Sequence, residues 1–212
     1  MTPVYAWMTA GLLTTGAIAS YTANSEALLR LIFGNPVVLI GLIVMQFALV
    51  AGLSWALSRI SAGVATALFL LYSALNGLTL SSIFVVYTSE SIASTFFITA
   101  GTFALMSAYG YFTKRDLTSW GNLLFMALIG FFIASIVNIF LRSSALYWVI
   151  TYAGVLIFVG LTAYDTQKIK RMASAAAPGD LQKVAIFGAL ALYLDFLNLF
   201  LMLLRILGGR RD

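Results

Sequence analysis

Seven long apolar segments restrict this chain to a fold in which most side chains face lipid or other apolar side chains. A membrane-spanning helix needs about 20 predominantly apolar residues. Only 9% of the 212 residues are charged, whereas a soluble domain carries about 25%. The sequence therefore predicts an all-α integral membrane protein, with residues 1–212 in a single domain. The seven segments are 4–23, 36–58, 62–87, 91–112, 118–141, 145–167 and 184–206.

The links between these segments predict how the helices follow one another. Only two links, 24–35 and 168–183, are longer than a few residues. The first apolar segment is longer than the apolar part of a signal peptide and no basic residue precedes it, so we predict that it is retained as a helix. The remaining links are so short that the helices they join must be antiparallel neighbours: 59–61, 88–90, 113–117 and 142–144.

The basic residues of the links predict the orientation in the membrane. Cytoplasmic loops carry an excess of Lys and Arg. One set of alternate links carries seven of these residues and the other set carries two, which places the N-terminus in the cytoplasm. Seven crossings would put Arg210 and Arg211 outside, against the same rule, so the side of the C-terminal tail is left open. The seven are Arg59, Lys114, Arg115, Lys168, Lys170, Arg171 and Lys183, and the two are Arg30 and Arg142.

Composition excludes several kinds of chemistry. The chain has no cysteine, so disulfides, thiolate metal sites and thiol nucleophiles are excluded. It also has no histidine, the usual switch between pH 5 and 8, so any pH response near neutrality must come from carboxylates. The surplus of twelve Lys and Arg over seven Asp and Glu is explained by loop charge. We predict a lipid bilayer as the surroundings, no nucleic-acid partner and no cofactor.

Two aspartates, Asp165 and Asp195, are the acidic residues that lie inside apolar segments. They stand in the stretches Gly160-Leu-Thr-Ala-Tyr-Asp-Thr-Gln and Ala191-Leu-Tyr-Leu-Asp-Phe-Leu-Asn. A charged residue at the centre of a membrane helix costs about 2.5–3.5 kcal/mol on insertion scales, so such a residue marks a functional site by default. The other acidic residues fall in predicted links or at a terminus: Glu26, Glu90, Asp116, Asp180 and Asp212.

Structural explanations compete with a functional site at these positions. Asp165 precedes Lys168 by three residues and could pair with it at the membrane surface. Asp195 could be a buried hydrogen-bonding residue with Asn138 or Asn76 as its partner. These asparagines and Asn198 must find polar partners in lipid, so each either forms structural hydrogen bonds or lines a polar pathway.

The helix ends leave the relative depth of the two aspartates uncertain. Asp165 lies about 4–5 Å along the axis from Lys168, whereas Asp195 lies about 16–17 Å from Val184. These depths match only if the last helix begins in the cytoplasm or if the sixth helix extends beyond Lys168 into water.

Four sequence motifs in the predicted helices and links form a recognisable pattern. Through these motifs the chain resembles the bacterial branch of the transmembrane Bax inhibitor motif family over nearly its whole length. The resemblance implies a bundle of seven helices with the last helix central, and a pH-sensitive calcium leak across the bacterial inner membrane. The stretches are Asn76-Gly-Leu-Thr-Leu-Ser-Ser-Ile-Phe, Gly110-Tyr-Phe-Thr-Lys-Arg-Asp-Leu, Val137-Asn-Ile-Phe-Leu and Leu161-Thr-Ala-Tyr-Asp-Thr-Gln.

The resemblance also implies site residues. Asp165 and Asp195 correspond by motif to the aspartate pair that senses pH and binds the cation in that family. Arg59 corresponds to an arginine associated with this pair, although it could equally be an ordinary orienting charge in a short cytoplasmic turn. Calcium prefers six to eight oxygen ligands, so two aspartates make an incomplete site that water, carbonyls or Asn198 would complete. Weak calcium binding in competition with protons is expected.

Rival functions stay open beside the leak channel. One is a regulatory membrane protein that conducts nothing and binds membrane proteases or other membrane proteins, and another is a proton-coupled transporter. An intramembrane aspartyl protease of the presenilin class is a third, but such proteases carry Gly-x-Gly-Asp where this chain has Leu192-Tyr-Leu-Asp. We therefore predict that the chain is not an enzyme.

Overall fold

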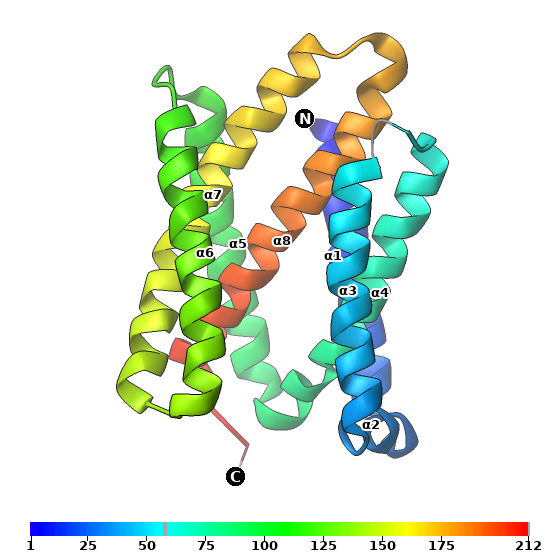
Figure 1. Cartoon of the computed structure of the whole chain (residues 1–212), viewed down its shortest axis with the longest axis vertical. Coiled ribbons are helices and arrows are strands. Elements are labelled where there is room, and N and C mark those ends of the chain that lie inside the picture. The colour runs from blue at the N-terminus through cyan, green and yellow to red at the C-terminus, as the bar shows by residue number, and fades with distance from the viewer. Residues whose placement is uncertain (57–58, 212) are drawn as a thin grey trace. The chain divides into compact units, whose positions relative to one another are not determined.

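The computed structural model describes residues 1–56 and 59–211 of the chain (Figure 1). A helix forms at each of the seven predicted segments, and the last two residues of the segment 36–58 lie outside the described residues. The prediction of an all-α protein is confirmed for the described part of the chain. The helices are α1 (Thr2–Ala23), α2 (Glu26–Phe33), α3 (Pro36–Ala56), α4 (Ala62–Val86), α5 (Ser89–Phe112), α6 (Thr118–Leu141), α7 (Ser144–Ala175), the 3-10 turn η1 (Pro178–Asp180) and α8 (Leu181–Leu207).

Six helical segments are long and apolar enough to cross a membrane: Pro36–Trp55, Ala62–Val86, Ser89–Phe112, Thr118–Leu141, Ser144–Ala175 and Pro178–Leu207. Helix α1 has 22 residues and is long enough to cross, but its threonines, tyrosines and glycines lower its mean hydropathy. The structure therefore defines a multi-pass membrane protein with six candidate spans among the described residues.

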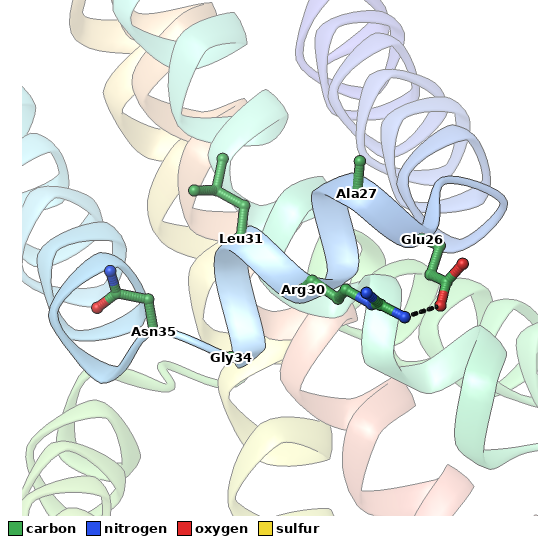
Figure 2. A pocket seen from close by; sticks show the side chains of 6 residues that line it. All are labelled: Glu26, Ala27, Arg30, Leu31, Gly34 and Asn35. Atoms are coloured by element: carbon green, nitrogen blue, oxygen red, sulfur yellow. Dashed lines mark hydrogen bonds and ion pairs between the residues drawn. The ribbon is translucent and has the colours of Figure 1, made fainter.

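The long link 24–35 contains a helix that the sequence analysis did not predict. Ser25 caps α2 by accepting a hydrogen bond from the Leu28 amide at 3.4 Å. Glu26 and Arg30 then form an ion pair one turn apart, with 2.6 Å between Oε1 and Nη2 (Figure 2). Eight residues between two longer apolar segments give too short a pattern to predict a helix from sequence, although the cap and the ion pair fit one.

The predicted loop 168–183 is also largely helical, which corrects the sequence interpretation. Helix α7 continues past Lys168 to Ala175, and α8 already begins at Leu181. Pro178 starts the short turn between them. Charged residues ended the apolar pattern at Gln167, but they did not end the helix, because Lys and Arg are good helix formers outside the lipid.

The chain divides into two compact units, which are described separately. Unit 1 comprises Met1–Ser89, Met172–Tyr193 and Arg210–Asp212, and unit 2 comprises Glu90–Arg171 and Leu194–Gly209. In unit 1, α3 lies beside α4, where the Gln46 amide donates to the Leu75 carbonyl at 2.9 Å (Figure 1). A buried hydrogen bond of 2.7 Å joins the hydroxyls of Thr15 on α1 and Tyr193 on α8.

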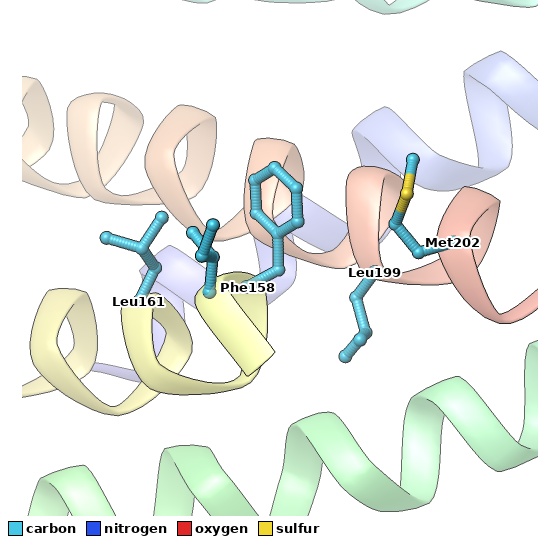
Figure 3. Packing of buried hydrophobic residues seen from close by; sticks show 5 residues of the cluster. Phe158, Leu161, Leu199 and Met202 are labelled. Carbon is cyan, nitrogen blue, oxygen red and sulfur yellow. The ribbon is translucent and has the colours of Figure 1, made fainter. Parts of the chain in front are cut away.

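Unit 2 contains α5, α6, most of α7 and the second half of α8. Its apolar core consists of Ile157, Phe158 and Leu161 on α7 and Leu199 and Met202 on α8 (Figure 3). Phe158 also packs edge-on against a phenylalanine of α6, with 5.7 Å between the ring centroids. This core fixes how α7 and α8 run past each other.

A close contact between backbones joins α5 to α7 in unit 2. A side chain at Gly110 would overlap the carbonyl group of Ala163, so only glycine allows this approach. Small residues at helix interfaces serve the same purpose in other membrane proteins. The contact brings the end of α5 to the part of α7 that precedes Asp165.

The C-terminal tail lies at the end of the bundle where α5 begins. In unit 2 the Gly209 amide donates to Ser91 Oγ at 2.9 Å, and in unit 1 the Arg211 amide donates to the Val86 carbonyl at 2.9 Å. Helix α5 is a candidate span and separates Ser91 from the link 113–117. The tail and that link therefore lie at opposite ends of this candidate span, and the side of the membrane on which the tail lies stays a question for labelling.

Candidate functional site

Asp165 and Asp195 come together in unit 2. Asp165 lies on α7, Asp195 lies on α8, and their carboxyl groups lie within hydrogen-bonding reach of each other. The Asp195 side chain is almost fully buried, with 3% of the residue exposed. Since an ionised carboxylate only accepts hydrogen bonds, the two groups can bond to each other only when one of them carries a proton.

One carboxyl oxygen of the pair, Asp195 Oδ2, is buried without a hydrogen-bond partner among the described residues. A buried polar atom without a partner is costly, and a proton, a water molecule or a cation could satisfy it. The described residues contain no cluster of three or more acidic side chains that could hold a metal ion. Calcium at this site would take most of its oxygen ligands from water or from carbonyl groups.

Buried hydroxyl groups lie close to Asp165 along α7, and one of them bonds to α5. Ser107 Oγ and Thr166 Oγ1 share a hydrogen bond of 2.9 Å, directly after Asp165 on α7. Thr162 is fully buried one turn earlier and donates to the Phe158 carbonyl at 2.8 Å. The sequence analysis did not single out these residues, because serine and threonine are common in membrane helices. Their register with Asp165 was the available signal.

The side chain of Lys168 does not replace Asp195 as the hydrogen-bond partner of Asp165. Its ammonium group attracts the Asp165 carboxylate by Coulomb interaction and lies 5.8 Å from the centroid of the Tyr164 ring. Asp165 thus interacts with both Lys168 and Asp195, and its role stays a prediction.

The three asparagines make local hydrogen bonds. The Asn198 amide donates to the Leu194 carbonyl at 2.8 Å, within α8. The Asn76 amide donates to Tyr72 at 2.9 Å, within α4. Asn138 Oδ1 accepts from the Ser143 amide at 3.0 Å, at the end of α6. These contacts account for their presence in apolar helices, and their predicted support of the aspartate pair stays a prediction.

Arg59 belongs to unit 1, in the turn between α3 and α4. The side chain is exposed, and the guanidinium group stacks over the Trp55 ring with 4.5 Å to its centroid. Such a contact suits an arginine at a membrane surface, where aromatic and basic side chains gather. Its predicted association with the aspartates is not tested by this contact and stays a prediction.

A polar network fixes the link 113–117 to α7 just beyond the aspartate pair. The Gln167 side chain accepts from the Leu117 amide at 3.0 Å and donates to the Arg115 carbonyl at 2.9 Å. Arg171 bonds to Asp116 Oδ1 at 2.8 Å. Hydrogen bonds from Thr118, assisted by Arg171, lower the pKa of Asp116 to about 2. The network positions the end of α7 relative to the start of α6.

A separate pocket of about 590 Å³ lies on α2 and does not include either aspartate (Figure 2). Charged, polar and apolar residues line it, and they belong to the short helix and the turn that follows it. Arg30 in this pocket is already paired with Glu26. The lining residues are Glu26, Ala27, Arg30, Leu31, Gly34 and Asn35.

The fold and the buried carboxyl pair define an all-helical, multi-pass integral membrane protein with a polar site inside its helices. The family described as inhibitor of apoptosis-promoting Bax1 matches residues 1–212, and the chain belongs to this family. The resemblance found in the sequence is confirmed.

The similarity to relatives covers the full chain. Inner membrane protein YbhL of Escherichia coli K12 is 62% identical over 214 residues, which cover 100% of this chain and 92% of that protein. A protein of Borreliella burgdorferi is 50% identical, with coverage of 99% and 91%. Protein RP147 of Rickettsia prowazekii is 45% identical, with coverage of 100% and 90%. The prediction of a multi-pass protein of the bacterial inner membrane is thereby confirmed.

Proposed function

We propose that this protein is a pH-sensitive, calcium-permeable leak channel, in which Asp165 and Asp195 sense pH and control the gate. The observation that carries this proposal is the close approach of two buried carboxyl groups within the membrane-spanning helices. Ionisable residues in this environment are costly and usually functional. Membership of the Bax inhibitor family supports the same assignment.

Proton occupancy of the pair provides the pH response. With one proton, the two carboxyl groups hold each other and keep α7 and α8 together at this level. Loss of that proton leaves two negative charges side by side in a medium of low dielectric constant, where they repel strongly. The helices then separate, or a cation enters between the carboxylates. Flux is therefore expected to rise as the pH rises through the titration of the pair.

Calcium fits the same pair as a permeant ion. Two carboxylates supply charge and two to four oxygens, while calcium ordinarily takes six to eight. The ion would keep part of its water shell and bind weakly, which suits conduction because an ion that binds tightly does not leave. Protons and calcium compete for the same oxygens, so acid opposes flux in two ways.

The proposal includes the number of membrane crossings and the position of α8. We place α1 as a seventh crossing and α8 at the centre of the bundle. Buried side chains from Ala185 to Leu204 on α8 support the central position. Arg59 is assigned an influence on the gate in one of its states. No enzymatic activity is proposed, since the aspartates lie in Ala-Tyr-Asp and Leu-Tyr-Leu-Asp rather than in a protease motif.

Purified protein in liposomes tests the proposal directly. Calcium entry is followed with a trapped fluorescent indicator while the external pH is varied, and protein-free liposomes provide the background. We expect calcium entry above background that increases with pH. Absence of flux at every pH, from protein shown to be folded, would instead favour a regulatory membrane protein that does not conduct.

A further inference from the structure

Unit 2 carries a basic surface at the end where α5 finishes and α6 begins. The segments 113–117 and 168–175 contain five basic residues and a single acidic one, Asp116. Asp116 is already paired with Arg171. The surface therefore carries a strong positive charge at the boundary of the membrane-spanning helices. It consists of Lys114, Arg115, Lys168, Lys170 and Arg171.

Several contacts hold these side chains in one place. Lys170 Nζ donates to the Tyr111 carbonyl at 2.7 Å and lies 4.3 Å from the centroid of the Tyr111 ring. Gln167 joins α7 to the backbone of Arg115, as described above. The link that carries Lys114 and Arg115 is thus held beside the part of α7 that carries the other basic residues.

Lys168 and Arg171 flank the first turn of α6. Arg171 Nη1 donates to Thr118 Oγ1 at 3.1 Å. The Tyr164 ring packs directly against Gly121, and the Lys168 ammonium lies over that ring. The indole of Trp120 stands on the same turn of α6 and is 61% exposed. Tryptophan at such a position is typical of the lipid headgroup level.

Below Trp120, α6 offers an apolar face to the bilayer. Large apolar side chains follow one another along it, and most of their surface is exposed. These side chains would contact acyl chains in the membrane, directly beneath the basic surface. They include Leu123, Met126, Ile133 and Phe140, which are 57–81% exposed.

We propose that this surface binds an anionic phospholipid, with the phosphate group at Lys168, Arg171 and Arg115 and the acyl chains along α6. A free phosphate ion would use the basic side chains only, whereas a phospholipid uses both the charge and the apolar face. Basic pockets at the membrane surface commonly bind anionic headgroups. Each Lys or Arg near the surface attracts anionic lipid with an energy that corresponds to a roughly fivefold local enrichment. This inference does not depend on the channel function.

Quenching of Trp120 fluorescence by brominated lipid tests the proposal. The variant Trp7→Phe/Trp55→Phe/Trp148→Phe leaves Trp120 as the single tryptophan. It is reconstituted in phosphatidylcholine vesicles that contain equal small fractions of brominated phosphatidylglycerol or brominated phosphatidylcholine. We expect the phosphatidylglycerol to quench Trp120 at least about twice as strongly, because the basic residues enrich it locally. Equal quenching by the two lipids would overturn the proposal.

Charge variants locate the binding site. The excess quenching is the difference between quenching by brominated phosphatidylglycerol and by brominated phosphatidylcholine. The substitution Arg115→Gln/Lys168→Gln removes two charges and leaves the Arg171–Asp116 pair in place, so this excess should fall to near zero. The matched control Arg30→Gln/Arg142→Gln removes two charges from other links and should keep the excess. Persistence of the excess in the first variant, or equal loss in both, contradicts a site at this surface.

Two further measurements complete the test. Inorganic phosphate, compared with chloride at matched ionic strength, should leave the excess quenching unchanged. Its displacement of the lipid signal would instead identify a site for free phosphate. If the charge variant fails to reconstitute, the single-tryptophan protein is titrated with salt, and excess quenching that is insensitive to salt contradicts binding through charge.

Discussion

The carboxyl groups of Asp165 and Asp195 lie within hydrogen-bonding reach of each other, where α7 and α8 run past each other in unit 2. The pair lies between the apolar core around Phe158 and the polar network around Gln167. One side of the pair is thus fixed by apolar packing and the other by hydrogen bonds to the link 113–117. A change of charge at the pair would act directly on the contact between the two helices.

Replacement of Gly110 should weaken the contact between α5 and α7. A methyl group there would overlap the backbone of Ala163, which cannot move as a flexible side chain does. We expect Gly110→Ala to destabilise the protein by about 1–3 kcal/mol, measured by denaturation in mixed micelles. The control is Gly130→Ala on α6, where a methyl group would meet no atom within 4 Å. Equal stability of the two variants would contradict the described packing.

Loss of the Gln167 side chain should release the link 113–117 from α7. The substitution Gln167→Ala removes the partner of the Leu117 amide and of the Arg115 carbonyl. We expect a loss of about 1–3 kcal/mol in stability and faster proteolysis at Lys114 and Arg115, because buried backbone groups lose their hydrogen bonds. Ser119→Ala, at an exposed position in the first turn of α6, serves as a control for nonspecific effects. Unchanged proteolysis in Gln167→Ala means that other contacts hold the link.

Topology can be measured because the chain has no cysteine. We expect a cysteine at Gly208 to react with an impermeant maleimide added to intact cells, since the tail lies opposite to the link 113–117. Cysteines at Ser119 and Ala175 should react only after the cells are opened. Labelling of Ser119→Cys in intact cells would show that the predicted orientation is wrong. With the N-terminus in the cytoplasm, an odd number of crossings puts the tail outside, so protection of Gly208→Cys would contradict seven crossings.

Arg59→Ala separates an effect on gating from a role in insertion. If Arg59 acts on the gate, the pH midpoint of calcium flux should shift in this variant while the amount of inserted protein stays the same. Arg142→Ala, which also removes an exposed arginine between two helices, is the matched control. An unchanged midpoint with normal insertion removes Arg59 from the gate and leaves its stacking on Trp55 as its role.

Sequence reasoning predicted the long helices well and the ends of the helices poorly. Segments of about 20 uncharged apolar residues have few alternatives to a helix in lipid. The predicted segment 145–167 ended too early, because Lys168 to Arg171 interrupt the apolar pattern without interrupting the helix. The alternative that this helix extends beyond Lys168 is confirmed. Helix α2 was missed because eight residues give no clear period.

The contact within the aspartate pair could not be derived from spacing alone. With helix ends at Gln167 and Val184, the two aspartates lay at different depths. In the structure, Asp165 lies about 15 Å before the end of α7 and Asp195 lies about 21 Å after the start of α8, so their depths are similar. The family resemblance supplied the pairing that the sequence pattern left uncertain. The hydroxyls of Ser107 and Thr166 carry no comparable signal in sequence.

The pH profile of calcium flux through the aspartate variants tests the central claim most directly. Liposomes holding wild-type protein, Asp165→Asn, Asp195→Asn or the double variant are compared between about pH 5 and 8. Asp180→Asn, which removes an exposed carboxylate, is the control. An asparagine keeps the shape and the hydrogen bonding of the site but cannot titrate, so the fold should be retained.

We expect wild-type flux to rise with pH, each single variant to lose this dependence, and the double variant to add little, because the two residues act as one unit. The control should keep the wild-type profile. Single variants that fold normally and retain the wild-type pH profile would contradict the assignment of Asp165 and Asp195 as the pH sensor.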